Sequence, residues 1–179
     1  MKDSPFFKQA DLLVQMLPFV NAETCFALKG GTAINFFVRN FPRLSVDIDL
    51  VYVPVEDRAA SLRGIDGALK RIAAKIRRSM PAAQVMERKL AAESSVVKLT
   101  VRVPNLGEVK IEPNTVLRGV VHPTTERTLV ARAVEVFGRS ATMQTVSLPE
   151  LYGGKLCAAL DRQHPRDLFD VHGLLQAEG

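Results

Sequence analysis

The segment VDIDLVYV, residues 46 to 53, places two aspartates among apolar residues and is followed by Pro54. Alternation of acidic residues with Val, Ile and Tyr predicts a β-strand, and the proline predicts its end. Successive side chains of a strand point to opposite faces, so Asp47 and Asp49 share one face while Ile48 lies on the other, buried face. The strand is therefore predicted to lie in a core and to carry two like charges at one place.

The aspartate pair has two explanations. An isolated Asp-x-Asp pattern often lies at a strand end, where its carboxylates only meet water. Two carboxylates this close also repel each other and resist burial, and no arginine stands beside them on the strand, so a divalent cation is the second explanation. Oxygen ligands alone favour Mg²⁺ or Mn²⁺ over zinc. The apolar residues around the aspartates favour the metal explanation.

A glycine pair precedes the aspartate strand. The apolar run of residues 26 to 28 leads into Gly30 and Gly31, and TAINFFVR then has the pattern of a helix that begins at or near Thr32. Such a pair either only turns the chain, or lets backbone N–H groups and the Thr32 hydroxyl approach phosphate oxygens. It is not a Walker A loop, because no lysine followed by Ser or Thr stands at the required position.

The rest of the chain predicts helices and further strands. Helices are expected near residues 6 to 19 and 57 to 79, from Leu148 to about Asp161, and after Pro165, and strands over AQVMERKL, SSVVKLTVRV and GEVKIEP. Residues 126 to 137 have the pattern of either a strand pair or a short helix.

Composition limits the class of protein. The 179 residues are 47% hydrophobic and 24% charged, which indicates one globular domain. No apolar run is long enough to cross a bilayer and the N-terminus has no signal-peptide pattern, so a cytoplasmic location without a membrane partner is expected. Cys25 and Cys157 are too isolated for a disulfide framework or a zinc site. A net charge of +5 is compatible with a polyanionic partner.

Four segments in this order, LKGGTA, RLSVDIDL, KIEPN and GGKLCAALDRQHPRDLFDV, resemble the AbiEii/AbiGii toxin family within the polymerase-beta-type nucleotidyltransferases. The resemblance implies an α/β (α+β) fold, with a mixed sheet flanked by helices. Residues 1 to 146 would form the nucleotidyltransferase core, and residues 147 to 179 a C-terminal helical segment that completes the site. Members of the family are commonly longer, so this segment is expected to be truncated relative to them.

The resemblance also implies roles for single residues. Asp47, Asp49 and Glu112 would bind two metal ions. Lys155 would reach the β- or γ-phosphate of a nucleoside triphosphate, and Asp167 would contact Lys155 or the nucleotide.

Further residues match the family around the nucleotide. Arg43 and Ser45, just before the aspartates, would contact phosphate or brace the Gly30 turn, whereas Asp170 is expected to be structural. The residues expected to bind nucleotide are Gly30, Gly31, Thr32, Arg43, Ser45 and Lys155.

The implied activity is Mg²⁺-dependent (or Mn²⁺-dependent) transfer of a nucleotide from an NTP to an acceptor hydroxyl. The chain would be the toxin of a toxin-antitoxin or phage-defence pair, with tRNA as acceptor and a separately encoded antitoxin as partner. Nucleotidylation of a small molecule or a protein is one alternative, and an NTP-binding or partner-binding module without turnover is another. If the acceptor is RNA, its backbone is expected along the basic helix face at residues 70 to 78 or along Arg88, Lys89, Lys98 and Arg102.

Overall fold

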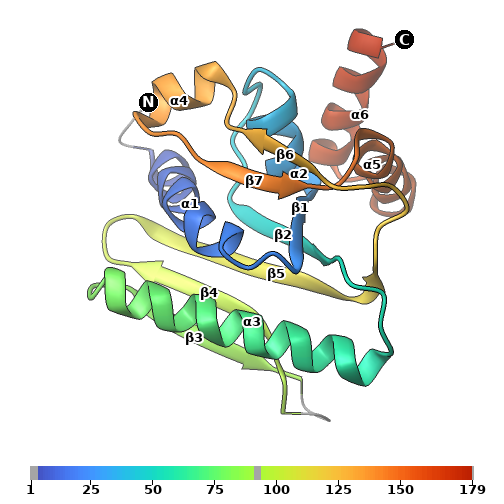
Figure 1. The fold of residues 1–179 in the computed structure, drawn as a ribbon. Coiled ribbons are helices and arrows are strands. Elements are labelled where there is room, and N and C mark those ends of the chain that lie inside the picture. Colours follow the sequence, from blue (N-terminus) through green and yellow to red (C-terminus); the bar gives the residue numbers. More distant parts are fainter. Residues whose placement is uncertain (1–3, 91–93, 179) are drawn as a thin grey trace.

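The computed structural model describes residues 4 to 90 and 94 to 178 and contains one seven-stranded mixed sheet in the order β3-β4-β5-β2-β1-β7-β6 (Figure 1). Strand β2, which carries the aspartates, pairs in parallel with β5 and antiparallel with β1, so it lies in the middle of the sheet. The strands are β1 (Phe26–Lys29), β2 (Asp47–Tyr52), β3 (Gln84–Lys89), β4 (Val96–Val103), β5 (Gly107–Arg118), β6 (Thr125–Thr128) and β7 (Thr142–Thr145).

Helices α1 and α3 cover one face of the sheet. Helix α1 packs on β5 and β7, α3 packs on β3, β4 and β5, and the two helices touch each other. Helices α5 and α6 lie together, far from α3 (Figure 1). The helices are α1 (Pro5–Asn21), α2 (Gly30–Ala33) with the π-helical turn η1 (Ile34–Val38), α3 (Arg58–Ser79), α4 (Ala131–Phe137), α5 (Leu148–Arg162) and α6 (Pro165–Glu178).

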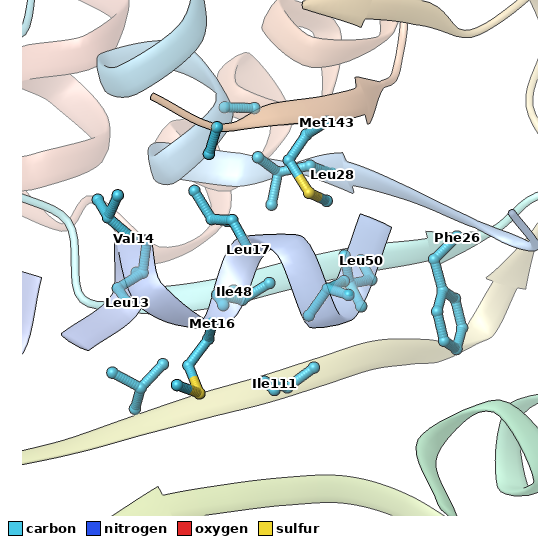
Figure 2. Close-up of a cluster of buried hydrophobic side chains, with 14 of the residues drawn as sticks. Leu13, Val14, Met16, Leu17, Phe26, Leu28, Ile48, Leu50, Ile111 and Met143 are labelled. Atoms are coloured by element: carbon cyan, nitrogen blue, oxygen red, sulfur yellow. The ribbon is translucent and has the colours of Figure 1, made fainter. Parts of the chain in front are cut away.

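The core lies between α1 and the central strands. Figure 2 shows Met16 and Leu17 of α1 beside Ile48 of β2 and Ile111 of β5, and all four side chains are fully buried. Ile48 and Ile111 are register partners, so they point to the same face of the sheet. The residues that alternate with them, including the two aspartates, therefore point to the opposite face.

Helix α3 begins at a side-chain cap, since Asp57 accepts a hydrogen bond of 2.8 Å from the backbone N–H of Ala60. The basic side chains at residues 70 to 78 are largely engaged in ion pairs. Lys70 pairs with Asp66, Arg71 and Lys75 with Glu23, and Arg77 with Glu87. This face of the helix therefore presents little unpaired positive charge.

Most predicted elements are present, with three differences. The helix after β1 begins at Gly30, where φ is 70°, rather than near Thr32. Residues 126 to 137 contribute to both β6 and α4, so each of the two patterns describes part of the segment. Strand β7 was not predicted, because its four residues are too short to show a period. No helix in the described parts of the chain combines the length and apolar character needed to cross a bilayer.

Candidate active site

The three acids of the predicted site lie on one face of adjacent strands. Asp49 is the register partner of Lys29 on β1 and of Glu112 on β5, and Asp47 is the partner of Lys110. Side chains of register partners point to the same side of a sheet. The fold thus places Asp47, Asp49 and Glu112 on the face opposite α1 and α3.

The carboxylate of Glu112 is paired with a lysine. Lys98 of β4 donates a hydrogen bond of 2.6 Å to Glu112, whose side chain is 48% exposed. Within residues 4 to 90 and 94 to 178, no three His, Cys, Asp or Glu side chains are grouped as metal ligands would be. The strands therefore place three acids at neighbouring positions, but the three carboxylates do not converge on one point as metal ligands would.

Asp49 occupies an electrostatically unfavourable place. Burial and the negative charge of Asp47 raise its pKa above the ordinary aspartate value, and the positive charges of Lys29 and Lys155 offset this only in part. A Cβ atom at Gly30 would lie 2.6 Å from Oδ2 of Asp49, so only glycine leaves room for this carboxylate. Two close carboxylates whose negative charge is offset only in part are a donor set that suits a hard divalent cation.

The loop before the aspartates is braced by side chains. Thr32 is 1% exposed, and its hydroxyl donates to the carbonyl of Asp47 at 2.6 Å and lies 2.8 Å from the hydroxyl of Ser45. This hydroxyl therefore has partners within the protein, and its contact with phosphate stays a prediction. The guanidinium of Arg43 lies against Gly31, where a Cβ atom would be 2.8 Å from Nη2. Of the two functions expected for Arg43 and Ser45, bracing the glycine turn is the one that these contacts serve.

Helices α5 and α6 bring a cluster of alternating charges beside the aspartates. Lys155 is only 8% exposed, donates a hydrogen bond of 2.8 Å to Asp167 and lies 3.2 Å from Asp170. Arg162 donates a 2.8 Å hydrogen bond to the other oxygen of Asp167. The implied contact between Lys155 and Asp167 is thus present, and the buried ammonium group has an anion on each of two sides.

Asp170 joins this cluster to the loop before β2. Both of its oxygens accept from Arg43, with a distance of 2.9 Å from Nε to Oδ1, and the amide of Asn35 donates to it at 3.2 Å. Its expected structural character agrees with these contacts. The bond between Arg43 and Asp170 ties α6 to the loop that carries the aspartates.

Asp167 is stabilised as a carboxylate. Burial alone would raise its pKa, but the hydrogen bond and charge of Lys155 and the charge of Arg162 lower it below the ordinary value. It therefore stays ionised at neutral pH.

Two cavities meet at these residues. The larger has a volume of about 700 Å³ and extends from Gly30, Asp49 and Glu112 to Lys155 and Arg162, with Leu117 and Leu151 among its apolar lining. The smaller, of about 180 Å³, shares Asp49, Lys155 and Arg162 and is lined by the following further residues: Gly31, Arg43, Ser45, Asp47, His164, Arg166 and Asp167. Every residue of the predicted site except Thr32 lines one or both cavities.

Three cations of the cavities were absent from the predicted site, and one of them, Arg166, lines only the smaller cavity. Lys29 lines the larger cavity beside Asp49, and Arg162 lines both. The position of Lys29 follows from strand pairing, which a sequence does not reveal. For Arg162 a signal existed, because it stands seven residues after Lys155 and so returns to the same side of an α-helix.

Two solved structures have a similar fold. MenT4, a nucleotidyltransferase toxin from Mycobacterium tuberculosis, matches with a TM-score of 0.63 and 19% sequence identity, over 97% of this chain and 60% of its own. A protein of H. pylori assigned as a nucleotidyltransferase matches with a TM-score of 0.57 and 18% identity, over 94% of this chain and 68% of its own. At these identities the likeness shows the fold alone, and this chain spans 60% of the length of MenT4.

No curated protein matches the chain in sequence. The family model of the AbiEii nucleotidyl transferase toxins of type IV toxin-antitoxin systems matches residues 11 to 179. The match extends over nearly the whole chain and confirms the resemblance carried by the four sequence segments. The chain belongs to the AbiEii nucleotidyl transferase toxin family.

Proposed function

We propose that this chain transfers a nucleotide from a nucleoside triphosphate to a hydroxyl group of tRNA, with Mg²⁺ or Mn²⁺ as cofactor. In this proposal it acts as the toxin of a toxin-antitoxin pair whose antitoxin is separately encoded. Family membership supports nucleotide transfer as the chemistry. The observation that carries the proposal is the larger cavity, in which Asp49 of the sheet faces Lys155 and Arg162 of α5.

The reaction requires one bond to form as another breaks. The oxygen of the acceptor hydroxyl bonds to the α-phosphorus, the bond from that phosphorus to the bridging oxygen breaks, and pyrophosphate leaves with its electron pair. The hydroxyl proton passes to a carboxylate of the site or to water. Charge therefore develops on the attacking oxygen and on the departing pyrophosphate, and the site must stabilise both.

Asp47 and Asp49 would hold the divalent cation, because their carboxylates share a face and nearby lysines offset the negative charge at Asp49 only in part. Glu112 would join them as a ligand once the cation replaces Lys98 as the partner of its carboxylate. A bound cation supplies activation of the hydroxyl and neutralisation of phosphate charge. Because Gly30 has no side chain, it leaves room for the Asp49 carboxylate.

Lys155 and Arg162 would stabilise the departing pyrophosphate from the opposite wall. Lys155 is held in place by Asp167 and Asp170, so its charge is oriented before substrate arrives. A preorganised charge in a partly buried site is worth more than the same charge in water, because no solvent has to reorient. Asp167 and Asp170 are positioning residues in this scheme.

The test is to incubate the protein with each α-labelled triphosphate, Mg²⁺ and total tRNA, and to follow label into RNA, protein and small molecules. We expect label in tRNA from at least one triphosphate, and its loss in Asp49→Ala and Asp47→Ala. Asp161→Asn, an exposed acid of α5, serves as the control and should label normally. Label that persists in Asp49→Ala, or that enters only protein or small molecules, contradicts the proposal.

A further inference from the structure

One half of the sheet face that carries the aspartates is uncovered. Helices α1 and α3 pack on the other face, and the outward side chains of β3, β4 and β5 are mostly exposed or partly exposed. This open sheet face is defined by the following residues: Gln84, Met86, Arg88, Lys98, Thr100, Arg102, Glu108, Lys110 and Glu112. It borders the two aspartates directly, because Lys110 is the register partner of Asp47.

Strand register arranges the open sheet face in rows that run to the aspartates. In one row Arg88 is the register partner of Lys98, and Lys98 donates a hydrogen bond to Glu112. Glu112 is in turn the register partner of Asp49. Arg88 is thus three strand spacings from Asp49, or roughly 14 Å at about 4.8 Å per spacing. A substrate several nucleotides long would extend over this distance while one of its hydroxyls lies at Asp49.

A second row of side chains contains the exposed apolar residue of this surface. Met86 is the partner of Thr100, Thr100 is the partner of Lys110, and Lys110 is the partner of Asp47. Met86 is 47% exposed and is the large apolar side chain of this face. A mainly polar and charged surface with one exposed apolar residue lacks the apolar centre that a protein partner needs.

The charges of the open sheet face favour a polyanion. It carries four cations, Arg88, Lys98, Arg102 and Lys110, while Glu108 and Glu112 pair with Arg102 and Lys98. Among the described residues, no carboxylate forms an ion pair with Arg88 or Lys110. The basic face of α3 differs in part: its lysines and arginines at positions 70, 71, 75 and 77 are ion-paired, and among the described residues only Arg78 of this face has no such partner.

We infer that the open sheet face is the docking surface for the acceptor RNA, whose phosphates contact Arg88 and Lys110 and whose reactive hydroxyl lies at Asp49. This inference rests on the proposed function, because it assigns the acceptor of the same site. Phosphate contacts of this kind fix position and register rather than sequence.

The experiment compares charge reversals on the two faces of the sheet. Arg88→Glu/Lys110→Glu alters the open sheet face, and Arg63→Glu/Arg78→Glu makes the same charge change on exposed positions of α3. Binding of fluorescently labelled total tRNA is measured at several KCl concentrations, and triphosphate binding is measured by calorimetry. Thermal unfolding checks that both variants are folded, and Arg88→Ala/Lys110→Ala provides a milder change on the same positions.

We expect Arg88→Glu/Lys110→Glu to bind tRNA at least tenfold more weakly, with a salt dependence lower by about two counterions. The α3 variant should bind within twofold of the natural protein, and both variants should bind triphosphate equally well. Equal tRNA binding by all the proteins would overturn the inference, as would transfer of nucleotide by the natural protein to a protein acceptor.

A failure of the docking surface can be distinguished from a failure of the proposed function. In Asp49→Ala the transfer reaction should disappear while tRNA binding stays within threefold, since Asp49 is not a phosphate contact. A chain that binds tRNA through Arg88 and Lys110 but uses no triphosphate would support the docking surface and overturn the proposed activity.

Discussion

Gly30 and Asp49 lie so close together that a Cβ atom on Gly30 would be 2.6 Å from the Asp49 carboxylate oxygen. Gly30→Ala must also hold a φ of 70°, which costs about 1 to 2 kcal/mol for a residue with a side chain. We expect Gly30→Ala to displace Asp49 and to lose at least tenfold in Mn²⁺ affinity, measured by calorimetry. Gly173→Ala, which meets nothing within 4 Å, is the control and should bind Mn²⁺ normally.

Asp170 should be a large contributor to stability. It is buried, and it carries bonds from Arg43 and Asn35 and an ion pair with Lys155. Asp170→Ala leaves buried cations without their anion, so we expect a loss of about 3 to 5 kcal/mol in the free energy of unfolding, measured with urea. Asp161→Ala removes an exposed acid of the neighbouring helix and should change stability by less than about 0.5 kcal/mol. Equal effects of the two variants would refute this role for Asp170.

Asp66 should make stability depend on acid pH. Burial alone would raise its pKa, but hydrogen bonds from Lys70 and from the backbone N–H of Val96 lower it below the unfolded value of about 3.9. The stabilisation is therefore present above pH of about 4 and is lost as pH falls through the lower, folded pKa. Asp66→Asn should cost about 1 kcal/mol at pH 6, and the difference from the natural protein should shrink toward pH 2. Unfolding curves at both pH values test this, and a constant difference would contradict it.

Two glycines of α3 should respond oppositely to alanine. A Cβ atom on Gly64 would lie 2.1 Å from the hydroxyl oxygen of Tyr52, whereas one on Gly67 would meet only the end of the Arg71 side chain at 3.4 Å. Gly67→Ala should raise stability by up to about 1 kcal/mol through helix propensity. Gly64→Ala should instead lower it, because the buried Tyr52 ring must move. Thermal melts compare the stability of the two variants. A stabilising effect of Gly64→Ala would contradict the prediction, because it would show that the Tyr52 ring moves without a loss of stability.

Lys98 should compete with a metal ion for Glu112. Its ammonium group donates a 2.6 Å hydrogen bond to that carboxylate, so a cation that recruits Glu112 must displace it. We expect Lys98→Gln to bind Mn²⁺ at least threefold more tightly than Lys110→Gln, which removes an equal charge beside Asp47 but leaves Glu112 paired. Titration by electron paramagnetic resonance measures both, and equal affinities would argue against an exchange at Glu112.

The sequence alone was sufficient to predict strand β2 and the shared face of Asp47 and Asp49. Every second side chain of a strand points to the same face, so the alternation determines this arrangement. It also yielded the family, and with it the contact between Lys155 and Asp167. It did not reveal that Lys98 holds Glu112, since that pairing depends on how β4 lies against β5. The bond between Arg43 and Asp170 joins residues 127 positions apart, and no local pattern indicates such a partner.

Thr32 has contacts that its sequence pattern did not reveal. The pattern of glycines followed by threonine identified the correct turn, but the threonine hydroxyl donates to the carbonyl of Asp47. A buried hydroxyl group needs a hydrogen-bond partner, and the nearest one belonged to the strand that follows. The helix itself begins at Gly30 rather than at position 32.

The order of elements along the chain has a consequence for protein synthesis. All seven strands precede α5 and α6, so a ribosome completes the aspartate strand long before it makes Lys155, Asp167 and Asp170. Domains assemble as the chain emerges from its N-terminal side. A nascent chain therefore holds its acids with Lys29 and Lys98 but without Lys155 and Arg162, and the complete charge arrangement arises only when the last helices dock.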